Sequence, residues 1–154
     1  MIEAPKIIKT NAGLAAVIRL TIPREKIREV MGPGLSELMA AVSAQGIATT
    51  GPWFTHHFRT DPKVFDFEIG VPVASRVSAA GRVQPSELPA HTVARTIFHG
   101  DYEGLAAGWR ELDDWMAANG HATGPDFWEV YLVGPESAPK PEDWQTELSR
   151  PIQE

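Results

Sequence analysis

"ANGHATGPDF", residues 118–127, carries the same landmarks in the same order as "AQGIATTGPWF" at residues 44–54. In both stretches a glycine suited to ending a helix is followed by a Gly-Pro turn and then by an aromatic run. A second pair of landmarks follows, "FEIGVPV" at 67–73 and "TELSRPI" at 146–152. Two matched pairs in one order predict an internal duplication, with a non-repeating α+β domain as the alternative.

The hydrophobic pattern around these landmarks predicts one strand-helix-strand-strand unit, present twice. Apolar residues recur at helical spacing in 33–45 and 102–119, with Pro33 suited to a first helical position. "PREKIREVM", residues 23–31, reads as a separate helical turn that breaks at Gly32. Runs of β-branched and aromatic residues predict strands at 14–23, 53–58, 64–73, 91–99, 126–132 and 144–152, and "GRVQPSELPA" a short strand with a corner.

We therefore expect residues 1–154 to form a single α+β domain, a pseudo-twofold duplication of a βαββ unit. Repeat 1 covers about residues 12–73 and repeat 2 about residues 91–152. The expected sheet is antiparallel, with both helices on one face and a ligand groove between the units. The helix residues expected in the core are Leu35, Leu38, Met39, Leu105, Trp109, Leu112 and Met116.

Charge and composition narrow the class of protein. The formal net charge is −6, from 20 acidic and 14 basic residues, so no basic surface for nucleic acid is expected. No apolar run reaches the roughly 18 residues that a membrane helix needs, and residues 1–10 lack the apolar stretch of a signal peptide. We expect a cytoplasmic protein without a membrane or direct nucleic-acid partner.

Glu129 is the unusual residue of the expected strand at 126–132, because a carboxylate among aromatic residues is costly unless it is compensated. Alternation places Phe127, Glu129 and Tyr131 on one face. The other face, expected to pack on the helices, carries Trp128, Val130 and Leu132. A solvent-facing Glu129 is the alternative reading.

The first repeat is expected to supply the facing wall of the groove. Aligning the two Gly-Pro turns matches Phe54 with Phe127 and His56 with Glu129, and places Phe58 opposite Tyr131. In the next strand, alternation puts Glu68 toward the groove and the apolar residues Phe65, Phe67, Ile69 and Val71 toward the helices.

Metal and cofactor sites are not expected. The chain has no cysteine, and the adjacent residues His56 and His57 point to opposite faces of a strand, so they cannot bind one ion together. No phosphate-binding loop and no nucleophilic serine motif occurs in the sequence.

The motifs together resemble a known family. "GPWFTHHF", "DFEIGVPV", "HGDYE", "GPDFWEVYL" and the closing "TELSRPI" resemble the GyrI-like small-molecule-binding domain, over about residues 12–152. That domain also serves as the effector-binding domain of AraC- and MerR-type regulators. The resemblance implies two βαββ units with a ligand groove across the pseudo-twofold axis. His56 departs from the family, where an aromatic residue such as Tyr is expected.

The resemblance implies that Glu129 matches the acidic groove residue, which meets lipophilic cations among aromatic rings in multidrug-binding relatives. The ligand-binding residues expected here are Glu129, Tyr131, Phe127, Phe54, His56, Phe58 and Glu68. The first functional reading is a stand-alone protein that sequesters or senses aromatic or cationic small molecules. No helix-turn-helix pattern precedes the domain, so it is not expected to act as a transcription factor by itself, and a separate regulator and a topoisomerase are the alternative protein partners.

Two further readings stay open. Some stand-alone relatives hydrolyse strained cyclopropane-bearing compounds, and the same carboxylate would then act as a general base, with Glu129 and Tyr131 as the catalytic pair. The family's namesake interacts with DNA gyrase, which makes a protein–protein modulator of a topoisomerase the third reading.

Overall fold

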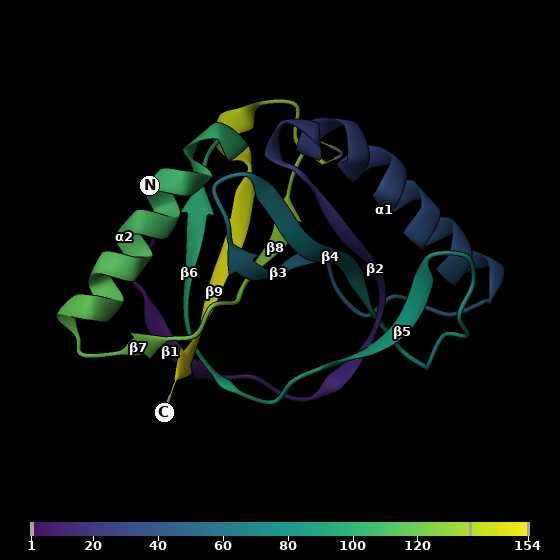
Figure 1. The fold of residues 1–154 in the computed structure, drawn as a ribbon, viewed down its shortest axis with the longest axis horizontal. Coiled ribbons are helices and arrows are strands. Elements are labelled where there is room, and N and C mark those ends of the chain that lie inside the picture. Colours follow the sequence, from purple (N-terminus) through teal and green to yellow (C-terminus); the bar gives the residue numbers. More distant parts are fainter. Residues whose placement is uncertain (1, 136, 154) are drawn as a thin grey trace. The chain divides into compact units, whose positions relative to one another are not determined.

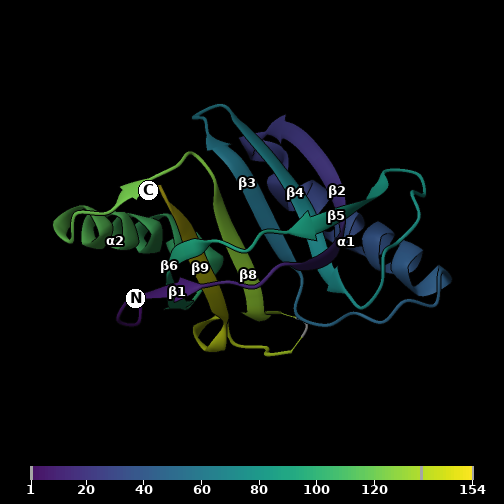
Figure 2. The same cartoon turned by 90° about the horizontal axis from the view of Figure 1, so that it is seen from below.

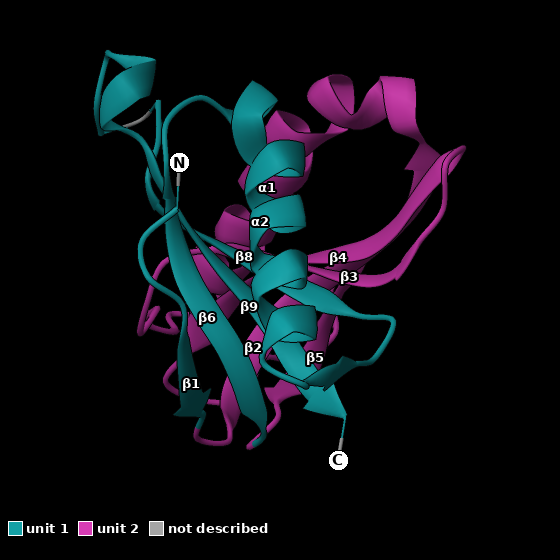
Figure 3. Ribbon diagram, turned by 90° about the vertical axis from the view of Figure 1, so that its left-hand side faces the viewer, with its two compact units in different colours: residues 1–10, 91–154 teal, residues 11–90 magenta. Residues whose placement is uncertain are grey.

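The computed structural model describes residues 2–135 and 137–153. The chain divides into two compact units, shown in Figure 3: unit 1 holds residues 1–10 and 91–154, and unit 2 holds residues 11–90. Each unit combines one long helix with antiparallel strands, which confirms the predicted α+β class. How the two repeats face each other, and with it the expected groove, stays a prediction.

Unit 2 contains the first predicted repeat. Its strands pair in the order β3-β4-β2-β5, all antiparallel, and Figure 2 shows β3, β4 and β2 side by side. The short strand predicted in "GRVQPSELPA" is β5. The elements are β2 (Gly13–Pro23), a 3-10 turn (Arg24–Lys26), α1 (Ile27–Ala44), β3 (Phe54–Thr60), β4 (Val64–Val73) and β5 (Val83–Leu88).

Unit 1 contains the second repeat and the N-terminal strand. Its strands pair in the order β8-β9-β6-β1, with β7 added to β9, and Figure 1 shows α2 beside β6. The elements are β1 (Lys6–Lys9), β6 (Thr92–His99), a 3-10 turn (Tyr102–Gly104), α2 (Leu105–Ala118), β7 (Ala122–Thr123), β8 (Phe127–Val133), a 3-10 turn (Pro141–Asp143) and β9 (Gln145–Gln153).

The predicted strand-helix-strand-strand order is present in both units, with the same pairing. In each, the last strand lies between the other two: β4 between β2 and β3, and β9 between β6 and β8. Strands β1 and β7 were not predicted. Both are short, and each is stabilised by pairing with a strand distant in sequence or at the end of the chain, which local pattern cannot show.

Helix α1 differs from its prediction, because the separate turn and the helix at 33–45 form one helix, Ile27–Ala44. Pro33 therefore lies inside the helix rather than at its start. An internal proline costs roughly 3 kcal/mol through its lost N–H and ring clash. Gly34, Leu38 and Val42 are buried along the same helix, and their packing on the sheet offsets that cost.

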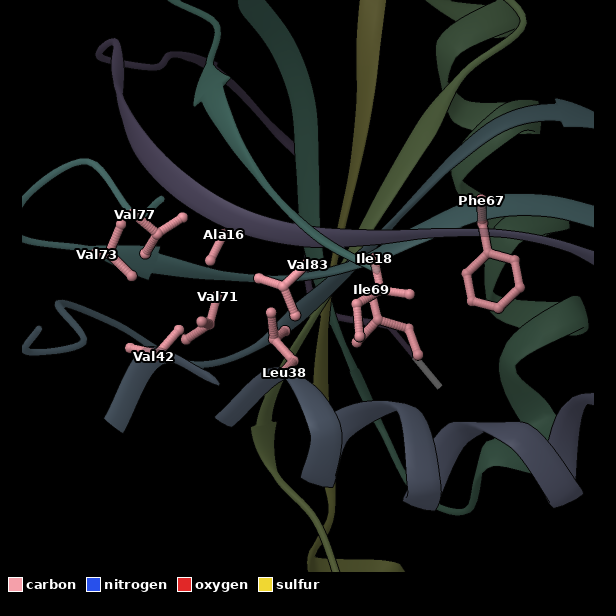
Figure 4. Packing of buried hydrophobic residues seen from close by; sticks show 10 residues of the cluster. All are labelled: Ala16, Ile18, Leu38, Val42, Phe67, Ile69, Val71, Val73, Val77 and Val83. Atoms are coloured by element: carbon pink, nitrogen blue, oxygen red, sulfur yellow. The ribbon is translucent and has the colours of Figure 1, made fainter. Parts of the chain in front are cut away.

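The core of unit 2 is formed by α1 against β2, β4 and β5. Figure 4 shows Leu38 and Val42 of α1 pointing toward the valines and isoleucines of the strands. A Cβ on Gly34 would lie 2.7 Å from the Ile69 side chain, so the glycine allows the close approach of helix and sheet. The fully buried strand residues here include Ile18, Phe67, Ile69 and Val83.

The core of unit 1 follows the same plan. Leu112 and Met116 of α2 pack against Ala94, Phe98 and Leu148 of the strands. Gly108 lies under the Phe98 ring, where a Cβ would come within 2.7 Å. "GLSEL" at 34–38 and "GWREL" at 108–112 thus occupy equivalent turns of the two helices.

Most of the predicted helix core is confirmed. Leu38, Leu112 and Met116 are fully buried, while Leu35, Leu105 and Trp109 are partly buried against the core clusters. The prediction that Met39 lies in the core was wrong, since the residue is 39% exposed. The buried residues of α1 are spaced four apart, and Met39 lies one residue, about 100° around the helix, from that row.

The neighbouring residues Leu38 and Met39 test this packing within one helix. Leu38→Ala should lower the free energy of unfolding by about 2–5 kcal/mol, because it removes a fully buried side chain. Met39→Ala, its matched control, should change it by less than about 0.5 kcal/mol. Urea denaturation followed by circular dichroism measures both. Equal losses for the two variants would contradict the assigned face of α1.

Candidate functional site

The face on which Glu129 lies is fixed by its cross-strand neighbours. Glu129 pairs with Leu148 and Tyr131 pairs with Thr146 across β8 and β9. Leu148 is fully buried in the cluster formed with Leu112 and Met116 of α2, and directly opposed residues share a face. Glu129 and Tyr131 therefore face α2.

The expectation that this strand turns Trp128 and Val130 toward the helix was wrong. They lie on the face away from α2, and Trp128 is nevertheless only 9% exposed, while Leu132 lies at a shift in the pairing register. Because both faces of β8 carry buried aromatic residues, alternation could separate the two faces but could not tell which one meets the helix.

Both carboxylate oxygens of Glu129 accept a hydrogen bond. The indole Nε1–H of Trp109, on α2, donates to Oε2 at 2.7 Å, and the Tyr131 hydroxyl donates to Oε1 at 2.8 Å. Glu129 is 9% exposed. Two short bonds to a charged acceptor offset much of the cost of taking a carboxylate out of water, which explains its place in an aromatic strand.

Aromatic rings continue outward from both donors. Trp109 meets the Phe127 ring edge-on, with ring centroids 4.8 Å apart. On the other side, Tyr131 meets Tyr102 edge-on at 5.9 Å, and Tyr102 packs on Trp144 at 4.8 Å. Aromatic faces around a buried carboxylate are the surroundings in which an organic cation is best stabilised.

The sequence pattern missed three of these residues as members of the site. Trp109 fits the apolar stripe of its helix, which predicts a core position, and the hydrophobic pattern does not mark Tyr102 or Trp144 as site residues. A comparison of "GLSEL" with "GWREL" could have indicated Trp109 as a site residue, because it occupies the position where the first repeat has Leu35.

The expected residues of repeat 1 lie in unit 2, on the sheet face away from α1. His56 pairs with Glu68 across β3 and β4, and His56 Nδ1 lies 3.7 Å from the Glu68 carboxylate. The Phe58 ring lies 4.5 Å from His56, and the Arg19 guanidinium lies 4.0 Å above it. The predicted orientation of β4 is confirmed, with Phe67 in the helix-facing core and Glu68 on the opposite side.

Phe54 was also expected in the groove wall, but its ring packs against Gly70 in the structure. Its ring covers Gly70, its cross-strand neighbour, so closely that a Cβ there would clash, and Phe54 is only 3% exposed. The structure therefore brings together Glu129, Tyr131 and Phe127 within unit 1, and His56, Glu68 and Phe58 within unit 2.

The expected match of His56 with Glu129 was wrong by one residue. Ile69 and Leu148 are equivalent in the repeats "FEIGVPV" and "TELSRPI", and their cross-strand partners are Thr55 and Glu129. Thr55 is therefore the counterpart of Glu129. The Gly-Pro turns align by letters, but a one-residue difference in the turn reverses the face of every side chain after it.

The corrected alignment makes His57 the counterpart of Tyr131. His57 Nε2 lies 3.2 Å from the Thr55 hydroxyl, as the Tyr131 hydroxyl lies against Glu129. In both strands the pairing register shifts directly after this residue. His57 stacks on Phe67 at 5.1 Å, so the two repeats hold a polar pair at the same place with different chemistry.

The pKa values of Asp113 and Asp66 are displaced in opposite directions. Burial raises the pKa of Asp113 above its ordinary 3.8, partly opposed by Arg150, whose Nη1 lies 3.5 Å away. Asp66 behaves oppositely, because a hydrogen bond from Arg19, reinforced by Arg59 and Thr21, lowers its pKa from 3.8.

Within residues 2–135 and 137–153, no group of three His, Asp or Glu side chains is placed to hold a metal ion. In the same ranges no helix is long and apolar enough to cross a membrane.

The chain belongs to the family of the GyrI-like small molecule binding domain, whose model matches residues 3–153. No curated protein matches it.

Solved structures share the fold at low sequence identity. The EcmrR C-terminal domain superposes with a TM-score of 0.87 at 21% identity, covering 98% of each chain. In the EcmrR–DNA complex the chain spans 57% of the length of the EcmrR chain. A hydrolase from Listeria innocua matches with a TM-score of 0.70 at 14% identity, covering 97% of this chain and 91% of that one. SAV2435 bound to tetraphenylphosphonium matches with a TM-score of 0.61 at 13% identity, covering 98% of this chain and 94% of that one.

The ion pairs of Asp66 predict how stability depends on pH. A carboxyl group whose pKa is lowered by folding stabilises the fold above its unfolded pKa of about 3.9, and this contribution is lost as pH falls through the folded pKa. Asp66→Asn should therefore be less stable than wild type at pH 7, with a difference that shrinks below about pH 4. Urea denaturation at a series of pH values measures it. The exposed Asp143→Asn is the control, and a difference for Asp66→Asn that grows on acidification would contradict the assignment.

Proposed function

We propose that this domain binds a small amphipathic molecule with an aromatic body and a positive charge, and sequesters or senses it. The family is one of small-molecule-binding domains, and the positive charge of the ligand is the further step. The observation that carries it is Glu129, a nearly buried carboxylate held by two donors among aromatic rings.

The arrangement of Glu129 suits a counter-ion. Trp109 and Tyr131 fix the carboxylate in place before a ligand arrives, so little reorganisation accompanies binding. Each carboxylate oxygen has a second acceptor position, which can meet a cationic group. In surroundings of low polarity a charge pair is worth more than at the surface, and the rings of Phe127 and Tyr102 add cation–π attraction.

The similar structures support this class of ligand and a partner for the protein. SAV2435 was solved with tetraphenylphosphonium, a lipophilic cation. EcmrR was solved in a complex with DNA, and its C-terminal domain alone matches this chain over 98% of both lengths. The proposal includes a separate regulator as the partner of this protein. It also includes the cytoplasmic location that the sequence predicts.

Hydrolysis of an electrophilic compound is the second candidate. The observation that favours it is the 2.8 Å hydrogen bond between the Tyr131 hydroxyl and Glu129, a pairing in which a proton can be exchanged with a substrate. Both oxygens of Glu129 are instead held by donors of the protein, Trp109 and Tyr131, which fix the carboxylate in place. This pattern supports the counter-ion role over that of a general base.

Replacing the charge alone tests the proposal. Glu129→Gln keeps the shape of the side chain, and tetraphenylphosphonium should bind it roughly tenfold or more weakly than wild type, since a lost charged contact is worth about 1.5–3 kcal/mol. Isothermal titration calorimetry measures the affinity. The control is Glu87→Gln, an exposed strand carboxylate on β5, which should leave it unchanged.

Unchanged affinity in Glu129→Gln would contradict the counter-ion role. Mass detection of water addition to a cyclopropane-bearing electrophile by wild type, lost by about 10² or more in Glu129→Gln, would favour the hydrolase instead.

A further inference from the structure

Arg150 is a nearly buried cation that the proposed counter-ion role does not use. It follows Leu148 by two residues on β9 and pairs with Ala94, so its side chain starts on the face that meets α2. Only 15% of the side chain is exposed. The Nε atom is buried and has no hydrogen-bond partner among the residues that the structure describes.

The remaining contacts of Arg150 are long. Its Nη1 lies 3.5 Å from Asp113 Oδ1, and its Nη2 donates to the Gly124 carbonyl at 3.4 Å. Bonds between a guanidinium and a carboxylate are usually about 2.7–2.9 Å and often come in parallel pairs. Asp113 Oδ1 is itself buried and accepts no hydrogen bond within the described ranges. Arg150 therefore keeps unused capacity for a carboxylate that reaches it with better geometry.

Phe127 connects this cation with the carboxylate of the site. The Arg150 guanidinium lies 5.6 Å from the centre of the Phe127 ring. The same ring contacts Trp109 at 4.8 Å, and Trp109 donates to Glu129. A negative and a positive group thus lie in contact with two adjoining aromatic rings of one unit.

We propose that the ligand is an aromatic zwitterion, whose ammonium group meets Glu129, whose ring lies along Phe127 and whose carboxylate meets Arg150. The Glu129 half of this statement rests on the proposed function. The planar guanidinium favours a planar, singly charged carboxylate, because its fork matches two oxygens at once. A doubly charged phosphate would meet the same single guanidinium with Asp113 beside it, and like charges repel.

Matched probes test the Arg150 half directly. 4-(Aminomethyl)benzoate carries both charges on one ring, and its methyl ester keeps the ammonium and the ring but lacks the anion. Calorimetry should show that wild type binds the acid about tenfold more tightly than the ester. Arg150→Gln should abolish that ratio by weakening the acid alone, Arg150→Lys should keep part of it, and Glu129→Gln should weaken both probes.

The outcomes separate this inference from the function on which it rests. Equal binding of acid and ester by wild type overturns it, as does equal weakening of both in Arg150→Gln, which would make Arg150 a link between α2 and β9 only. Wild type that binds tetraphenylphosphonium but neither probe also overturns it and leaves the proposed function standing. If Glu129→Gln binds tetraphenylphosphonium with the affinity of wild type, that result contradicts the proposed function instead. If Arg150→Gln does not fold, the ratio of acid to ester in wild type decides alone.

Discussion

The hydrogen bonds that hold Glu129 between Trp109 and Tyr131 are the interaction on which the candidate site depends. They join a residue of α2 to β8 through a charged acceptor, so the helix and the strand define the site together. A carboxylate in this position without either donor would destabilise the fold. With both donors it is a fixed acceptor among aromatic rings, where a cation can meet it.

The two units share one strand order but have different polar residues at equivalent positions. Each unit has the same strand order, and each helix approaches its sheet through a buried glycine, Gly34 or Gly108. At equivalent positions the second repeat has Trp109, Glu129 and Tyr131, whereas the first has Leu35, Thr55 and His57. The charged site therefore lies in one of two units that share the same strand order.

The sequence was most informative where local chemistry decides structure. Strand β4 was predicted with its observed bounds, because Val64–Val73 alternates and is bracketed by turns. The single helix through Pro33 could not be foreseen, since tertiary packing of Gly34 and Leu38 overrides the local cost of proline. The face of Glu129 was missed because both sides of β8 are buried. The donor Trp109 was missed because a hydrogen bond between residues twenty apart leaves no trace in the period of a helix.

The nuclear magnetic resonance signal of the Trp109 indole N–H, assigned by its loss in Trp109→Phe, reports directly on the bond to Glu129. A short bond to a buried carboxylate predicts slow hydrogen exchange and a downfield shift. The signal should move when tetraphenylphosphonium is added and should lose its downfield shift in Glu129→Gln, while the signal of Trp115, on the same helix, stays in place. A Trp109 indole that exchanges as fast as that of Trp115, and responds neither to the ligand nor to Glu129→Gln, would contradict the account.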